Sequence, residues 1–146
     1  MVHRSDVIQA PPEAVWSYLS VPKNWPEWDP DITSIVEGDG TDEAVMVEGS
    51  KMAVQFSNGM AGTCNFPVAE PHKFCRWEFS FFAGLMKGIG TFTLTPQESD
   101  DGTVTKFDYT FSMEGFVGSI MSVVGNKAII EGTENGLANI AKHFAK

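Results

Sequence analysis

Side chains able to move protons are scarce in the half of the sequence that alternates like β-strands. Near residues 103–113 the pattern predicts a strand with Tyr109 on its apolar face and Asp108 on the opposite face. The Tyr109 hydroxyl could orient a ligand carbonyl or exchange a proton with it. It could also belong to an ordinary core tyrosine whose hydroxyl is satisfied. Tyr109 is therefore the one catalytic residue that the sequence nominates, with Tyr18 of an earlier helix second to it.

The remaining ionisable residues fit a solvated surface. Glu78 and Arg76 alternate with aromatic residues, so they, like Asp108, would face inward only if a one-residue bulge inverted the register. His72 follows Pro71 in a predicted turn, which favours exposure. The three histidines are widely separated in sequence, which argues against a metal site. We expect neither a metal ion nor a cofactor.

Cys64 and Cys75 are the only cysteines in the sequence. A hairpin that turns near residue 72 would place Cys64 opposite Phe79 and Cys75 opposite Val68, too far apart for a disulfide. We therefore interpret both as reduced core residues, which are typical of a reducing compartment. No apolar run approaches the ~20 residues of a membrane span, and the N-terminal sequence lacks a signal-peptide core. These features predict a cytoplasmic protein without integral membrane association.

The negative charge of the chain argues against polyanionic partners. Lysine and arginine number 10 against 19 aspartates and glutamates, which gives a formal net charge of −9 over 146 residues. Nucleic-acid backbones and anionic membrane surfaces would repel such a protein. We therefore expect no nucleic-acid partner.

Alternation with a period of two begins at Asp31 and predicts an antiparallel sheet. Ahead of it, Pro11 and Pro12 predict the start of a helix, while Pro22 and Pro26 permit only a short second helix. The predicted strands, separated by turn-forming residues, are 2–9, Ile32–Glu37, Glu43–Glu48, Lys51–Phe56, Met60–Ala69, Phe74–Phe82, Gly88–Thr95 and Thr103–Met113.

The proline-free stretch from Phe116 to Lys146 predicts helical structure at the C-terminus. Its apolar residues form two stripes on nearly opposite sides, and glycines at the changeover would allow a bend. The pattern fits either one long helix gripped by a curved sheet or two short successive helices. The stripes include Ile120 and Val124, then Leu137 and Ile140.

The predicted sheet has one aromatic-rich face and one solvated face. A single helix cannot easily fill so broad an apolar surface, so the remaining space is either closed by packing or left as a pocket. The candidate ligand-binding residues share that apolar face or pack over it: Trp28, Val54, Phe56, Cys64, Phe66, Trp77, Phe79, Phe81, Phe92, Phe107, Tyr109, Phe111, Ile120 and Val124.

Residues 10–30 read APPEAVWSYLSVPKNWPEWDP, and this pattern resembles the polyketide cyclase/dehydrase and lipid-transport superfamily. This START-like group (SRPBCC) has the helix-grip fold of the birch-pollen allergens. The order of predicted elements matches along the whole chain, so the resemblance implies a single domain over residues 1–146. It implies an α+β fold: a curved antiparallel sheet of about seven strands around a long C-terminal helix, with two short helices after the first strand. It also implies a hydrophobic cavity between sheet and helix, but no catalytic motif carries over.

Three functions fit these observations. The first is binding or transport of a hydrophobic small molecule such as a lipid or polyketide, because the inward surface lacks a matched acid and base. The second is a polyketide cyclase, aromatase or dehydratase in which Tyr109 acts with a bulge-inverted Asp108 or Glu78. The third is a protein-interaction module, including a homodimer, that uses the apolar segment Phe81–Met86 at an expected hairpin tip.

Overall fold

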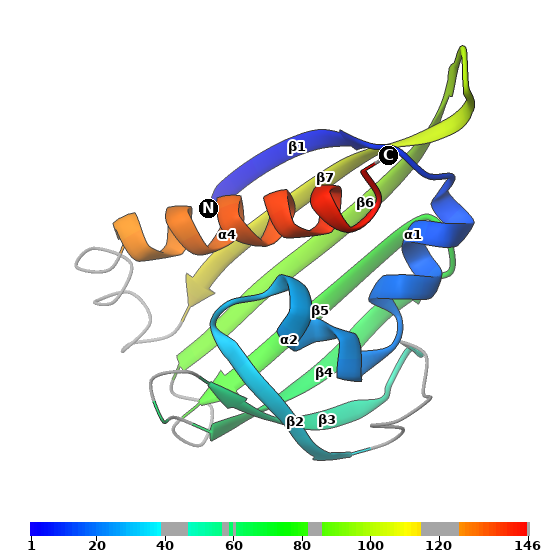
Figure 1. The fold of residues 1–146 in the computed structure, drawn as a ribbon. Coiled ribbons are helices and arrows are strands. Elements are labelled where there is room, and N and C mark those ends of the chain that lie inside the picture. The colour runs from blue at the N-terminus through cyan, green and yellow to red at the C-terminus, as the bar shows by residue number, and fades with distance from the viewer. Residues whose placement is uncertain (39–46, 57–58, 60, 82–85, 115–125, 146) are drawn as a thin grey trace.

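The computed structural model describes residues 1–38, 47–56, 59, 61–81, 86–114 and 126–145 (Figure 1). At residues 36–38, 81, 86, 126 and 128 it describes the backbone alone. Two predictions fall on side chains outside this description: the first helical stripe, with Ile120 and Val124, and the apolar segment Phe81–Met86. The predicted strand Glu43–Glu48 also falls mostly outside, and its described end, Val47 and Glu48, is not in a strand.

Seven antiparallel strands form one sheet in the order β1-β7-β6-β5-β4-β3-β2. Short turns join the later strands to their neighbours, while β1 pairs with β7. The strands are β1 (Val2–Ile8), β2 (Ile32–Gly38), β3 (Lys51–Phe56), β4 (Ala61–Glu70), β5 (Phe74–Phe81), β6 (Met86–Ser99) and β7 (Gly102–Glu114). These bounds confirm the predicted strands to within a few residues, apart from Glu43–Glu48.

Prolines set the lengths of the N-terminal helices. Pro12 begins α1 (Pro12–Leu19), where a missing N–H costs nothing. Pro22 starts a single 3-10 turn, η1 (Pro22–Asn24), and Pro26 lies in the first turn of α2 (Trp25–Trp28). The two short helices that the sequence predicts after the first strand are therefore confirmed.

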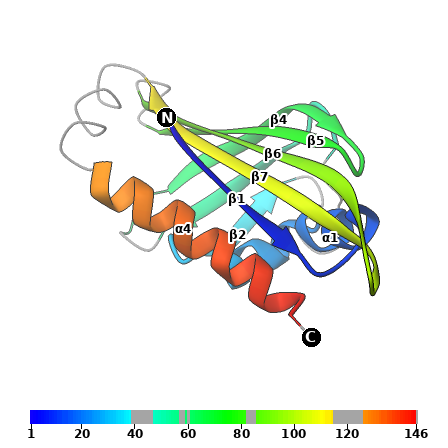
Figure 2. The same cartoon turned by 90° about the horizontal axis from the view of Figure 1, so that it is seen from above.

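The C-terminal helix α4 (Asn126–His143) crosses the concave side of the sheet. It packs against β1, β7 and α2, and Figure 2 shows it running along β1 and β7. Gly132 does not interrupt it, although the sequence allowed a bend there. The middle of the concave face is covered by α2 instead. The helix-grip α+β fold is thus confirmed, with α4 placed to one side.

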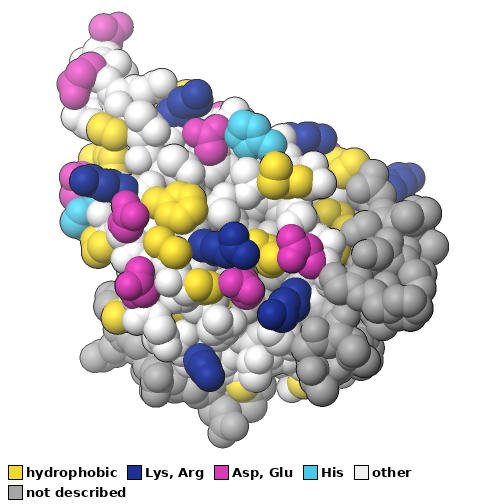
Figure 3. All heavy atoms as spheres, turned by 180° about the vertical axis from the view of Figure 1, so that it is seen from behind, with side chains coloured by type: hydrophobic (Ala, Val, Ile, Leu, Met, Phe, Trp, Pro, Cys, Tyr) yellow, Lys and Arg dark blue, Asp and Glu magenta, His cyan; other side chains and the backbone are white. Residues whose placement is uncertain are grey.

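The opposite face of the sheet is solvated. Figure 3 shows basic and acidic side chains scattered over it among smaller apolar ones. Asp108 lies there against His3, with Oδ1 2.9 Å from Nε2, and Arg76 lies 3.4 Å from Glu78. The alternative in which a bulge turns Asp108 or Glu78 inward is therefore wrong, because neither β5 nor β7 slips in register at those positions.

The β4–β5 hairpin turns at His72, whose φ of 68° is left-handed. Cys64 pairs with Phe79 as predicted, whereas Cys75 pairs with Ala69 instead of Val68. The one-residue difference arises from a register shift in β4 between Asn65 and Val68. Both cysteines are buried, and neither forms a disulfide.

Candidate functional site

The concave face carries a continuous layer of buried rings. Trp77 of β5, Phe92 of β6 and Tyr109 of β7 come from three adjacent strands, and alternation points them all inward. Their centroids lie 5.2–6.2 Å apart, within the range of favourable aromatic pairs. The strands therefore hold these side chains in fixed mutual positions.

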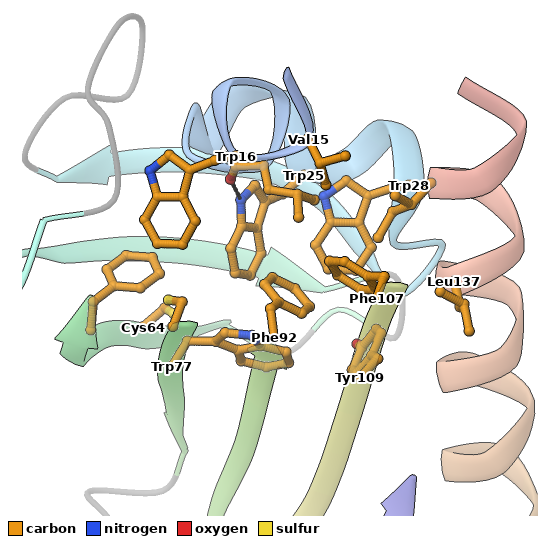
Figure 4. Packing of buried hydrophobic residues seen from close by; sticks show 14 of the residues in the cluster. Val15, Trp16, Trp25, Trp28, Cys64, Trp77, Phe92, Phe107, Tyr109 and Leu137 are labelled. Atoms are coloured by element: carbon orange, nitrogen blue, oxygen red, sulfur yellow. Dashed lines mark hydrogen bonds between the residues drawn. The ribbon is translucent and has the colours of Figure 1, made fainter. Parts of the chain in front are cut away.

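Trp25 and Trp28 of α2 close the layer from the other side (Figure 4). They lie three residues apart on a single helical turn, so both rings reach down toward the sheet. The Trp25 ring lies 5.5 Å from Trp77, and the Trp28 ring lies 5.6 Å from Phe92. Both tryptophans are completely buried. Much of the space above the sheet is therefore filled by α2.

Two of the indole N–H groups in this layer have no hydrogen-bond partner among the described residues. The dashed line in Figure 4 marks the 2.7 Å bond that Trp25 Nε1 donates to the carbonyl oxygen of Leu19. In contrast, Trp28 Nε1 and Trp77 Nε1 are buried and donate to no acceptor within the described part of the chain. A buried donor left unpaired costs about 1–3 kcal/mol.

Burial of the inner face decreases toward one end of the sheet. Phe56, Phe111 and Met113, which we call the apolar rim, are only half-buried. They lie where β3 and β7 end. The rings of the rim lead inward: Phe56 lies 5.2 Å from Phe79, and Phe111 lies 5.7 Å from Trp77. Trp77, which is itself fully buried, therefore connects the rim to the other buried rings.

The negative charges of two acidic residues act on the Tyr109 hydroxyl. Burial, and then the negative charges of Asp29 and Asp31, raise the pKa of Tyr109 well above 10. Asp29 follows α2 and is only 8% exposed. Its Oδ1 accepts a 2.9 Å hydrogen bond from the backbone N–H of Asp31, yet burial still raises its pKa to about 7. Asp29 could therefore exchange a proton with a ligand near neutral pH.

Sequence reasoning missed Asp29. Its neighbours Trp28 and Pro30 offered one signal, because an acid directly after a buried tryptophan and before a turn is held near the core. The structure also places Tyr18 outside the aromatic layer. Its ring stacks on His143 at 3.8 Å, and burial together with Glu27 raises its pKa to about 12.

Small and polar residues of helix α4 contact Trp28 and Tyr109. Asn139 Nδ2 donates a 3.0 Å hydrogen bond to the carbonyl oxygen of Trp28. A Cβ on Gly136 would lie 3.4 Å from the Trp28 ring and 3.6 Å from that of Tyr109, so the glycine lets the helix approach both rings. The α2–α4 contact thus encloses Trp28 and Tyr109 together.

The structure brings most of the predicted binding residues to one face. Phe81 lies in β5, but its side chain is outside the description, as are Ile120 and Val124. Phe56 and Phe111 are half-buried. The fully enclosed members are Trp28, Val54, Cys64, Phe66, Trp77, Phe79, Phe92, Phe107 and Tyr109.

The described residues contain neither a metal-ligand cluster nor a membrane-spanning helix. No group of three or more His, Cys, Asp or Glu side chains there is placed to hold a metal ion. No helix in the same part of the chain combines the length and apolar character needed to cross a bilayer.

Solved structures share this fold at low sequence identity. A Mesorhizobium loti protein, MLL2253, is 20% identical with a TM-score of 0.65, and the match covers 97% of this chain and 93% of that one. A Helicobacter pylori protein is 11% identical with a TM-score of 0.75 over 98% and 86% of the two chains. DynU16, from the dynemicin biosynthetic locus, is 23% identical with a TM-score of 0.58, over 94% of this chain and 45% of its own.

Among proteins with curated descriptions, none matches the chain significantly. The sequence profile of one family, described as polyketide cyclase / dehydrase and lipid transport, matches residues 1–145. The match covers every described strand and helix, and the curved sheet with its C-terminal helix agrees with it. The chain therefore belongs to the polyketide cyclase / dehydrase and lipid transport family.

Proposed function

We propose that the protein binds a hydrophobic small molecule of lipid or polyketide type on the inner aromatic face, between the sheet and α4. The observation that carries this proposal is the path of rings from the half-buried rim to the buried Trp77. Removing ligand carbon from water contributes about 25 cal/mol per Å² of apolar surface, so a ligand of modest size would bind without charged contacts.

The ligand enters at the rim in this proposal. Phe111 is half-buried and contacts Trp77, so an apolar molecule placed there gains contact with both rings at once. The proposed site keeps the ligand-binding residues that the sequence predicts. The rim forms its entrance, and Tyr109 lies at the end influenced by Asp29 and Asp31. A cytoplasmic location belongs to the same proposal, because two buried cysteines that form no disulfide suit a reducing compartment.

A titration with fluorene, followed by tryptophan fluorescence, tests the proposal. We expect saturable quenching in the wild type and a loss of affinity of about tenfold in Phe111→Gln, because the rim would become polar. Val7→Gln is the matched control, since Val7 is exposed on β1, and it should bind as the wild type does. Equal affinities in the two variants, or no saturable binding in the wild type, would contradict the proposal.

Asp29 favours a second candidate, an enzyme of polyketide cyclase or dehydratase type. A buried carboxyl with a pKa of about 7 beside Tyr109 can hold a proton near neutral pH and deliver it to a ligand carbonyl. This pairing replaces Asp108 and Glu78, which face outward. If the candidate is right, Tyr109→Phe and Asp29→Asn each lower turnover of an enolisable polyketide substrate while leaving its binding intact. Unchanged turnover in both would remove the candidate.

A further inference from the structure

The unpaired indole N–H of Trp77 places a hydrogen-bond donor within the apolar layer. Trp77 is completely buried, and its Nε1 has no acceptor in the described part of the chain. Trp25, its neighbour at 5.5 Å, satisfies its own N–H with the Leu19 carbonyl. The fold can therefore provide an acceptor for an indole, and the described residues provide none for Trp77.

Trp28 Nε1 also lacks an acceptor among the described residues. Trp77 is nevertheless better placed to meet a ligand. Among the described residues, the ring neighbours of Trp28 are Trp25, Phe92 and Tyr109, and all three are buried. Trp77 contacts Phe111 of the rim as well. A molecule that enters over Phe111 therefore meets the Trp77 ring before it can meet the rings of Trp28 and Phe92.

We infer that Trp77 is a specificity-determining residue whose Nε1–H donates a hydrogen bond to an acceptor oxygen on the ligand. The inference rests on the proposed function and narrows its ligand class to flat, mainly apolar molecules that carry a carbonyl or similar acceptor. A pure hydrocarbon leaves the donor unpaired, so the site discriminates against it. Sites built around an unpaired buried donor gain selectivity in this way.

A matched pair of probes isolates the hydrogen bond. Fluorene and 9-fluorenone share one tricyclic frame and differ by a single carbonyl. Transfer out of water alone favours fluorene, because the carbonyl of fluorenone has to lose its water. Tighter binding of fluorenone thus requires a donor in the site. We expect fluorenone to bind about tenfold more tightly, which corresponds to about one buried hydrogen bond.

The indole N–H resonances report the contact directly. The sequence has four tryptophans, so a nitrogen-15 spectrum of the wild-type protein contains four indole cross-peaks. Saturation with fluorenone should move the Trp77 peak downfield, while fluorene should not. The Trp25 peak is the internal control, since its N–H is already bonded to Leu19. Trp77→Phe, where it folds, should abolish the preference for fluorenone.

The outcomes separate the two claims. If both probes bind, fluorene binds more tightly and the Trp77 peak does not move with fluorenone, the inference is overturned. The proposed function stands in that case. If neither probe binds, the proposed function fails and the inference fails with it. A downfield shift at Trp77 with fluorenone alone, together with its tighter binding, supports both.

Discussion

The Trp77 indole lies directly over Gly90, its pairing partner across the β5–β6 ladder. A Cβ on Gly90 would stand 2.0 Å from Cζ2 of the ring and 2.3 Å from Cε2. Glycine at this position is therefore a condition for the ring to lie against the sheet. Because Trp77 connects the rim to the enclosed rings, the absence of one side chain on β6 determines the shape of the candidate site.

Gly90→Ala is expected to destabilise the protein strongly, by about 3 kcal/mol or more, as overpacking of a buried core does. The ring has buried neighbours and cannot move aside. Urea unfolding measures the effect. Gly132→Ala is the matched control: its Cβ would meet only the carboxylate oxygen of Asp31, at 2.9 Å, which can rotate away. Because alanine favours helix by about 1 kcal/mol over glycine, this variant should be neutral or slightly more stable, and equal losses in both would contradict the packing argument.

The stability of the protein should fall as pH rises from about 4 to 7, through Asp29. Its pKa in the folded protein, about 7, exceeds the ordinary value of 3.8, so the folded state holds this proton more tightly than the unfolded chain does. The contribution is complete below pH 3.8 and is lost as pH rises through 7. At about 1.4 kcal/mol per pKa unit, it amounts to a few kcal/mol.

Unfolding free energies of Asp29→Asn and the wild type between pH 4 and 8 test this effect. The variant should show a flatter profile, with its largest gain over the wild type above pH 7. Asp31, whose pKa burial also raises, contributes in the same direction and remains in the variant. Asp101→Asn removes the same charge from an exposed turn and should keep the wild-type slope. Identical slopes for Asp29→Asn and the wild type would rule out the buried carboxyl as the cause.

Asn139→Ala should loosen α4 from α2. The substitution removes the bond to the Trp28 carbonyl oxygen, which is worth about 1 kcal/mol. Hydrogen exchange of the α4 amides should accelerate several-fold. Asn135→Ala provides the comparison, because Asn135 is exposed one turn earlier on the same helix and the change in helix propensity is the same. Equal exchange in the two variants would show that the Asn139 bond does not hold α4.

Both cysteines should resist thiol reagents in the folded protein. Burial raises the pKa of Cys75 to about 12 and that of Cys64 well above 9, so neither forms the reactive thiolate near neutral pH. An aromatic disulfide reagent at pH 8 should label no thiol in native buffer and both in strong denaturant. Rapid labelling of the native protein would mean that the β4–β5 region opens readily.

The alternation of apolar and polar residues was sufficient to predict the sheet and to place Trp77 and Tyr109 on its inner face. In a strand, assigning one side chain to a face assigns all the others. It could not predict the pairing of Cys75, because the slip in β4 depends on the local backbone. The role of Gly90 could not be predicted either, because the Trp77 ring that it accommodates lies thirteen residues earlier on the neighbouring strand.

The position of α2 could not be derived from the sequence either. Trp25 and Trp28 showed that the short helix carries a large apolar surface, but not that it would occupy the middle of the concave face. That placement depends on tertiary packing against Trp77 and Phe92, and it buries Asp29 as a consequence. The burial of Asp29 therefore arises from tertiary packing, and its neighbours Trp28 and Pro30 indicate no more than that it lies near the core.

Nuclear Overhauser contacts between bound fluorene and the protein test the central claim, that apolar molecules bind on the inner aromatic face. We predict contacts from fluorene protons to the rings of Trp77, Phe79 and Phe111, and none to His3 or Thr110 on the outer face. Contacts confined to the outer face, or a folded protein that shows no contacts at saturating fluorene, would contradict the account.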